Sequence, residues 1–190
     1  SSSTFYALLG QELVRNGLPV EMLNAGVNGK GIPNLLVYLR EILVLFEPDV
    51  LIMDIGLNDS AGLRQIRSEV SRDKHRMSLL DLYRQILDFA AERGIDVILC
   101  QEPMSWELPL RPDTALYDGL AGLTRRAGGR VISPQAVLRE AEASAFVWWD
   151  TAHLAPHGHV LLARLLAPET ESVVRCRLSR SASGVKTSPP

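Results

Sequence analysis

Hydrophobic positions along the chain follow two spacings, one typical of helices and the other of buried strands. Apolar residues three and four apart predict helices over residues 5–16, 34–46 and 78–90. Two further helices are expected, one with Asp113 as its N-cap and one that begins after His153. Residues between these segments are polar or follow a different spacing.

Short apolar runs between the helices predict four strands, over residues 19–23, 49–55, 95–100 and 130–133. The run over residues 49–55 is nearly continuous, which is typical of a strand buried on both faces. Strands that alternate with helices form a parallel sheet with helices on its faces. The sequence therefore predicts an α/β fold, a three-layer α/β/α sandwich around a parallel sheet.

Composition limits the kinds of partner that we expect and indicates where the domain ends. The chain is 46% hydrophobic and 22% charged, with a net charge of −2, which gives no reason to expect nucleic acid or an anionic membrane as a partner. No apolar run approaches the roughly 20 residues of a membrane span. Residues 171–190 are rich in Ser, Arg and Pro, so we expect a disordered tail behind a domain over residues 1–170. Two cysteines, Cys100 and Cys176, are too few for a disulfide framework, and neither a metal nor a cofactor is expected.

Three polar segments stand near the ends of predicted elements. Asn24-Ala-Gly-Val-Asn-Gly-Lys-Gly31 follows the first predicted strand, Gly56-Leu-Asn-Asp59 follows the second, and Asp150-Thr-Ala-His153 precedes the last helix. The carboxyl ends of parallel strands lie along one edge of a sheet, where ligands bind. The first two segments therefore share this edge by topology, and the third can join them.

The residue types in these segments fit acyl transfer. A glycine lets its backbone N–H approach a developing oxyanion, and an Asn side chain can supply a second donor. An Asp three residues before a His can reach the imidazole Nδ1–H and fix the tautomer. The nucleophile is then the part that remains to be found.

The order of these segments resembles the SGNH (GDSL-like) hydrolase superfamily, a flavodoxin-like fold. Asn24–Gly31, Gly56–Asp59 and Asp150–Leu154 are similar to the family's second, third and fifth motifs, and the likeness covers about residues 20–167. It implies a serine hydrolase of carboxylic esters that works through an acyl-enzyme. Small acyl esters, acetylated sugars and lysophospholipids are candidate substrates, while the oligomeric state stays unpredicted.

The resemblance also implies a role for single residues. Gly29 and Asn58 would bind the oxyanion, His153 would be the base, and Asp150 would orient it. The family's first motif, Gly-Asp-Ser-x-Thr or Gly-Gly-Ser-Ser-Thr, is matched only by Ser1–Phe5. Aligning its threonine with Thr4 makes Ser2 the nucleophile, with Ser1 or Ser3 as the choice if the register is shifted. The glycine and the strand that precede this motif in the family are missing, so we expect an N-terminally truncated domain.

Three other interpretations stay open. Gly26–Gly31 could hold a phosphate or nucleotide at a helix start, although its spacing fits neither common phosphate motif. The chain could also be a non-catalytic relic of the hydrolase fold. His153 and His157 have a spacing that suits zinc, but no third ligand is evident. Trp148 and Trp149 are expected in the core rather than as a substrate platform, although one of them could form a wall of the site.

Overall fold

The computed structural model describes residues 4–27, 29–105, 112–150 and 152–182. Its chain divides into two compact units. One comprises Ala25–Glu102 and Leu110–Val131, and we call it the sheet unit. The other comprises Ser1–Asn24, Pro103–Pro109 and Ile132–Pro190, and we call it the helical unit.

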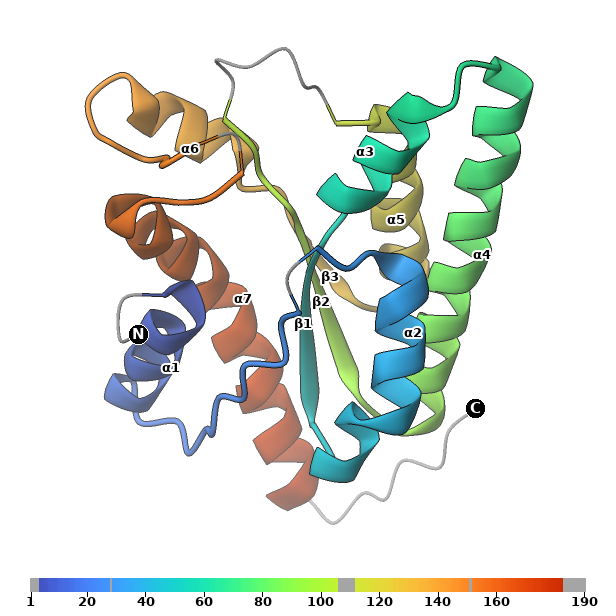
Figure 1. The fold of residues 1–190 in the computed structure, drawn as a ribbon. Coiled ribbons are helices and arrows are strands. Elements are labelled where there is room, and N and C mark those ends of the chain that lie inside the picture. The colour runs from blue at the N-terminus through green and yellow to red at the C-terminus, as the bar shows by residue number, and fades with distance from the viewer. Residues whose placement is uncertain (1–3, 28, 106–111, 151, 183–190) are drawn as a thin grey trace. The chain divides into compact units, whose positions relative to one another are not determined.

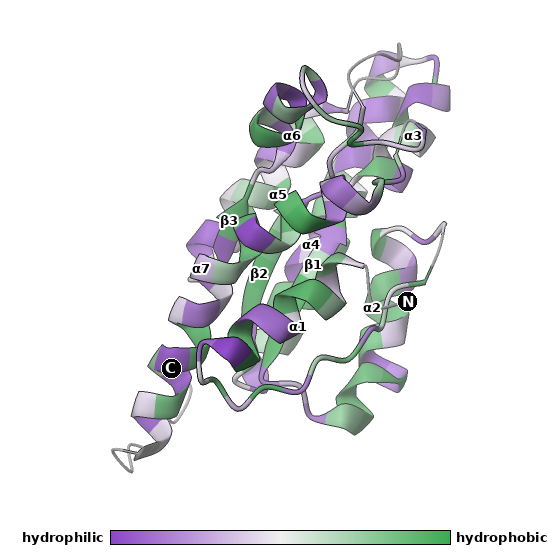
Figure 2. Ribbon diagram, turned by 90° about the vertical axis from the view of Figure 1, so that its left-hand side faces the viewer, coloured by the Kyte–Doolittle hydropathy of each residue, from purple (hydrophilic) through white to green (hydrophobic). Residues whose placement is uncertain are grey.

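A parallel sheet of three strands forms the centre of the sheet unit. The strands β1 (Val50–Ile55), β2 (Asp96–Gln101) and β3 (Arg130–Ile132) lie in that order, and β3 ends at the border of the unit. β1 and β2 are paired along their whole length, from Val50 opposite Asp96 to Ile55 opposite Gln101. The three strands predicted from apolar runs here are confirmed, and Figure 2 shows β1 and β2 as largely hydrophobic.

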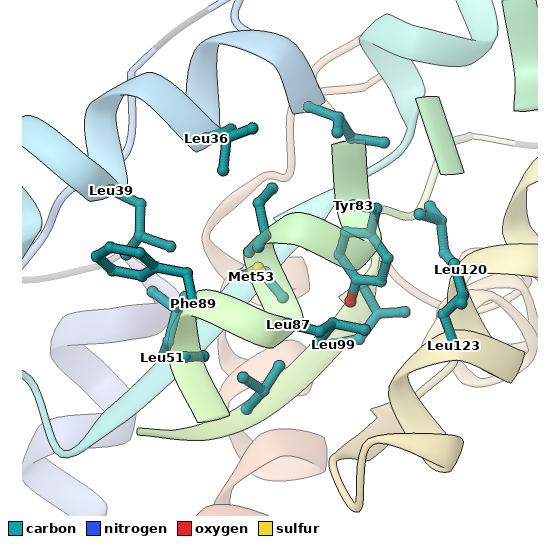
Figure 3. Close-up of a cluster of buried hydrophobic side chains, with 14 of the residues drawn as sticks. Leu36, Leu39, Leu51, Met53, Tyr83, Leu87, Phe89, Leu99, Leu120 and Leu123 are labelled. Atoms are coloured by element: carbon teal, nitrogen blue, oxygen red, sulfur yellow. The ribbon is translucent and has the colours of Figure 1, made fainter. Parts of the chain in front are cut away.

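Helices α2 (Ile32–Glu41), α4 (Glu69–Glu92) and α5 (Thr114–Arg126) share a hydrophobic core with one face of this sheet (Figures 1 and 3). Alternate residues of paired strands point to the same face, so the core takes the odd-numbered residues of β1 and β2. Tyr83 of α4 lies at its centre and is fully buried. The labelled core residues of Figure 3 are Leu36, Leu39, Leu51, Met53, Tyr83, Leu87, Phe89, Leu99, Leu120 and Leu123.

Two helix boundaries differ from those predicted. The helix expected over 34–46 begins earlier, at Ile32, and breaks at Ile42 into the short 3₁₀ helix η1 (Leu43–Phe46). Residues 60–77, which have no clear hydrophobic period, form most of α3 (Leu57–Gln65) and the first turns of α4, with residues 66–68 between the two helices.

The predicted start of this helix at residue 78 is therefore wrong, because α4 begins at Glu69. Ser68 is the N-cap instead, and its hydroxyl accepts the Ser71 N–H at 3.3 Å. The N-terminal part of α4 is mostly exposed, so an N-cap rather than an apolar stripe marks where it starts. The predicted N-cap of α5 is confirmed, since Asp113 accepts the Leu116 N–H at 2.8 Å.

The helical unit contains α1 (Phe5–Arg15), α6 (Gln135–Glu142) and α7 (Pro156–Ala182), of which α6 was not predicted. α1 packs along α7 (Figure 1), and both helices contribute fully buried leucines, Leu9 and Leu13 from α1 and Leu162 and Leu166 from α7. α1 ends as its sequence predicts, because Gly17 has a φ of +78°.

Two predictions for this unit are wrong. Residues 19–23 form no strand, because their alternating pattern finds no ladder, and the Val20 N–H instead turns back to the Leu18 carbonyl. Residues 171–182 are helical rather than disordered. The end of α1 supports them, since the Asn16 side chain donates to Glu171 at 2.9 Å and Arg175 donates to the Asn16 carbonyl at 3.1 Å.

Among the residues that the structure describes, no helix is both long enough and apolar enough to cross a membrane.

A pair of polar contacts ties α3, α4 and α5 together. The guanidinium of Arg76 donates to both carboxylate oxygens of Asp113 at 2.9 Å, and the Asp113 N–H donates to the hydroxyl of Ser60 at 3.2 Å. Partial burial opposes the charge on Asp113, but Arg76 and the Leu116 N–H outweigh it and hold the pKa of Asp113 below its ordinary value. α3, which carries Asn58, is fixed through this network.

Replacing Asp113 by Asn keeps a capping oxygen and removes only the charge. We expect Asp113→Asn to lower the free energy of unfolding by about 1–3 kcal/mol at pH 7. The contribution is complete above the ordinary aspartate pKa and disappears as pH falls through the lower pKa of the folded protein. Urea denaturation across this pH range measures it. Asp81→Asn, which removes the exposed partner of Arg84, is the control and should cost far less; a loss of equal size there would contradict the prediction.

Candidate active site

The turn between β1 and α3 requires a glycine at position 56. Gly56 has a φ of +127°, and a Cβ at this position would lie 2.8 Å from the ring of Tyr117. Both the backbone conformation and the close ring exclude a larger residue. Tyr117 on α5 thereby fixes where α3 begins.

The first N–H of α3 is bound by a carboxylate from the neighbouring strand. Glu102, the residue after β2, accepts the Leu57 N–H at 2.9 Å. The Tyr117 hydroxyl in turn donates to the Glu102 carbonyl at 2.9 Å. A carboxylate at a helix N-terminus is favourable because the first N–H groups have no partner within the helix. Neither Glu102 nor Tyr117 was predicted from the sequence; the position of Glu102 directly after a strand was the available signal.

The two residues that follow Leu57 hold the glycine-rich loop. The side-chain amide of Asn58 donates to the Lys30 carbonyl at 3.2 Å. The carboxylate of Asp59 accepts the Ile32 N–H at 3.1 Å and so caps α2. Burial raises the pKa of Asp59, and the bond from Ile32 opposes that rise. The structure therefore brings the first two predicted segments together at the carboxyl end of β1.

Gly29 and Gly31 of this loop have different functions in the fold. A Cβ on Gly31 would overlap the Asp59 carboxylate, so this position needs a glycine for the close approach. Gly29 has a φ of +71° with open space around its Cβ position, and it is exposed. The space around Gly29 would therefore accommodate a side chain, although its backbone conformation favours glycine. Asn28 lies outside the described residues.

Asp150 and His153 contact each other directly in the helical unit. The imidazole Nδ1 lies 2.9 and 2.8 Å from the two carboxylate oxygens of Asp150. The backbone N–H groups of Ala152 and His153 also donate to Asp150, and these bonds, followed by the one from the imidazole, lower the pKa of Asp150 to about 2. The carboxylate is thus ionised at every pH at which an imidazole can act as a base, and Nε2 is the basic atom of the neutral ring.

A short antiparallel ladder holds the loop that carries this pair. Trp148 and Leu154 form an isolated antiparallel bridge. The Trp149 N–H donates to the His153 carbonyl at 2.8 Å, and the Ala155 N–H donates to the Val147 carbonyl at 2.8 Å. Gly158 lets the first turn of α7 approach this ladder, because a Cβ there would lie 2.5 Å from the Val147 carbonyl.

The predicted serine nucleophile and the two histidines near His153 differ in what the structure describes of them. Ser2, the predicted nucleophile, lies outside the described residues, as do Ser1 and Ser3. His157 is exposed, while His159 is half-buried, stacks on the Phe5 ring at 6.3 Å and has a pKa lowered by burial.

A metal centre finds no support in the part of the chain that the structure describes. That part contains no group of three or more His, Cys, Asp and Glu side chains that could hold a metal ion. The expectation that both tryptophans of the pair belong to the core is wrong for one of them: Trp148 is buried, but Trp149 is 65% exposed.

The fold is shared with known hydrolases. An acetyl xylan esterase matches at a TM-score of 0.72 and 16% identity, over 87% of this chain and 90% of the other. A protein described as a GDSL-like lipase, from Parabacteroides merdae, matches at 0.70 and 17% identity, over 90% and 84%. An acetylxylan esterase from Geobacillus stearothermophilus matches at 0.71 and 18% identity, over 87% and 80%. The sequence matches no protein-family model and no curated protein.

These likenesses confirm the predicted fold class. The chain has the α/β fold of the SGNH (GDSL-like) hydrolases. At this level of identity the comparisons concern the fold alone, so the roles of single residues stay proposals.

The contact between Gly31 and Asp59 generates a test of the loop. We expect Gly31→Ala to displace the Asp59 carboxylate and to lower the free energy of unfolding by about 1–3 kcal/mol. Gly62→Ala on α3 is the matched control, because a Cβ there meets no atom within 4 Å. This control should be neutral or stabilising by up to ~1 kcal/mol. Chemical denaturation compares the two variants, and equal stabilities would show that the close approach at Gly31 does not matter.

Proposed function

We propose that this chain hydrolyses carboxylic esters through a serine nucleophile and an acyl-enzyme. The observation that carries the proposal is the direct contact of His153 with a carboxylate whose charge is secured by backbone N–H groups. This pair can deprotonate a hydroxyl and stabilise the resulting imidazolium. The loop and amide at the carboxyl end of β1 add hydrogen-bond donors of the kind that bind an oxyanion.

The proposed reaction has two halves. The Ser2 hydroxyl attacks the ester carbonyl carbon while its proton passes to Nε2 of His153. The tetrahedral oxyanion accepts hydrogen bonds from the Gly29 N–H and the Asn58 side chain. The intermediate collapses, the bond to the alcohol oxygen breaks, and His153 returns the proton to that oxygen. A water molecule, deprotonated by His153, then hydrolyses the acyl-serine by the reverse path.

The orientation of the Asn58 side chain supports its part in this reaction. Its Nδ2 already donates one hydrogen to the Lys30 carbonyl, so the amide is held with its nitrogen next to the glycine-rich loop. A side-chain amide has two N–H groups, and the second can serve an oxyanion beside the Gly29 N–H. The bond to Lys30 thus fixes the donor before the substrate arrives, which is what oxyanion stabilisation requires.

Short acyl esters are the first substrates to try. Small acyl esters, acetylated sugars and lysophospholipids all fit the proposed chemistry. Acetyl esters of sugars come first among them, because proteins with the same fold include acetyl xylan esterases. Hydrolysis of 4-nitrophenyl acetate is the general assay, and we expect it to be insensitive to EDTA. Activity lost with EDTA and restored by zinc would favour metal chemistry at His153 and His157, and no hydrolysis of any ester would favour a non-catalytic relic.

We expect His153→Ala and Asp150→Asn to lower kcat by several orders of magnitude with little change in KM, because both residues act on the transition state. His157→Ala is the control, since His157 is exposed on the first turn of α7 and lies outside the proposed pair. Steady-state kinetics on one ester compare the three variants. A large loss of kcat in His157→Ala with little loss in His153→Ala would show that the assignment of His153 as the base is wrong.

Asn58→Ala should lower kcat by about 10²–10³-fold, the usual cost of one oxyanion donor. Asn58→Asp keeps the size of the side chain but replaces donors with a negative charge, so it should be at least as damaging. If Asn58→Ala raises KM and leaves kcat unchanged, the amide binds substrate rather than the transition state.

A further inference from the structure

Two large aromatic side chains are exposed next to the proposed base. Phe146 is 61% exposed and Trp149 is 65% exposed. Their ring centroids lie 5.1 Å apart with the planes at 80°, an edge-to-face pair. Such a pair holds the indole in a defined orientation, since edge-to-face contacts are favourable. Clustered aromatic surface that stays in water commonly marks a binding site.

The ladder of the loop places the indole on the same side as the imidazole. Because Trp148 is bridged to Leu154, the next residues inward, Trp149 and His153, are opposite each other, and the Trp149 N–H bonds to the His153 carbonyl. Opposite residues of an antiparallel pair project to the same face, with Cβ atoms roughly 4.5–5.5 Å apart. Trp148 and Leu154 project to the other face and are both buried.

We propose that Trp149, held by Phe146, is a binding platform for the alcohol part of the ester, and that it takes a sugar ring. The inference rests on the proposed function, because it uses His153 as the group that protonates the leaving alcohol.

The chemistry of the base indicates which part of the ester lies beside Trp149. His153 must come within about 2.6–3.2 Å of the alcohol oxygen to return a proton to it. The carbon atoms attached to that oxygen then lie beside the residue opposite His153 in the ladder, which is Trp149. The acyl group, on the other side of the carbonyl carbon, extends away from this oxygen. The platform therefore selects the alcohol and not the acyl chain.

A sugar ring suits this platform better than an alkyl chain. The face of an indole is electron-rich and attracts groups with positive partial charge, such as the C–H groups on one face of a pyranose. A platform as open as this one leaves the sugar hydroxyls in water, where they need no protein partner. An alkyl chain would gain most from an enclosed apolar slot, whereas 65% of Trp149 is exposed.

The test compares two acetyl esters that differ in their alcohol. Methyl glucoside tetraacetate carries a pyranose ring, and ethyl acetate carries none. We expect Trp149→Ala to lower the ratio of kcat/KM for the sugar ester to that for ethyl acetate by about tenfold, mainly through KM. Trp149→Phe should restore part of the ratio. Phe46→Ala on η1 removes another exposed aromatic ring, 57% exposed, and should leave both rates unchanged.

Three outcomes would overturn the platform. An unchanged ratio in Trp149→Ala means that the ring does not contact the alcohol. An equal fall for both esters means that Trp149 only supports the loop of His153. A shift from dimer to monomer in Trp149→Ala on gel filtration, with the ratio unchanged, means that the aromatic pair is an interface between copies.

A binding measurement separates this inference from the proposed function. Titration with methyl glucoside, which has no ester, should shift the indole N–H resonance of Trp149 in the wild type, and Trp149→Phe identifies that resonance by its loss. If the wild-type chain hydrolyses neither ester but this shift is present, the proposed function fails and the platform stands. If the wild-type chain hydrolyses the esters but methyl glucoside does not shift the Trp149 indole resonance, the platform fails and the proposed function stands.

Discussion

The bond from the Ile32 N–H to the buried carboxylate of Asp59 holds together the proposed oxyanion side, the two segments that carry Gly29 and Asn58. Asp59 is only 8% exposed, and a buried carboxylate is costly unless hydrogen-bond donors satisfy it. Ile32 opens α2, so its N–H has no partner within that helix. The carboxylate thus gains a hydrogen-bond donor, and the N–H gains an acceptor. The bond fixes α2 against α3, and it is the reason why Gly31 can carry no side chain.

The acid–base pair depends on a different kind of constraint. Asp150 and His153 are three residues apart, and the ladder that supports them spans only residues 147–155. The oxyanion side, by contrast, joins segments from α2, α3 and the end of β2. The geometry of the Asp150–His153 pair is therefore determined by local sequence, and that of the proposed oxyanion donors by how distant segments pack.

This difference decides how much could be predicted from the sequence. The Asp–His contact follows from a three-residue spacing, and β1, β2 and β3 follow from apolar runs. The clamp of Tyr117 on Gly56 and the bond from Leu57 to Glu102 could not be predicted, because both depend on where α5 packs. Residues 19–23 have strand-like alternation but pair with no other strand, and the polar start of α4 has no apolar stripe. The hydrophobic pattern therefore predicted the wrong structure for the first segment and the wrong helix start for the second. Ser2 stays a prediction from resemblance.

The loop around Asp150 shows how one short ladder serves two purposes. With a side-chain period of two, Trp148 and Leu154 anchor the loop on its buried face while Trp149 and His153 project from the other. Asp150 is ionised because water solvates its exposed carboxylate and the N–H groups of Ala152 and His153 lower its pKa further. The pair can therefore be as exposed as it is, with 68% of the His153 side chain and 56% of that of Asp150 accessible. This exposure leaves the imidazole accessible to the bulky alcohol that we propose, and Trp149, opposite His153 in the ladder, is exposed as well.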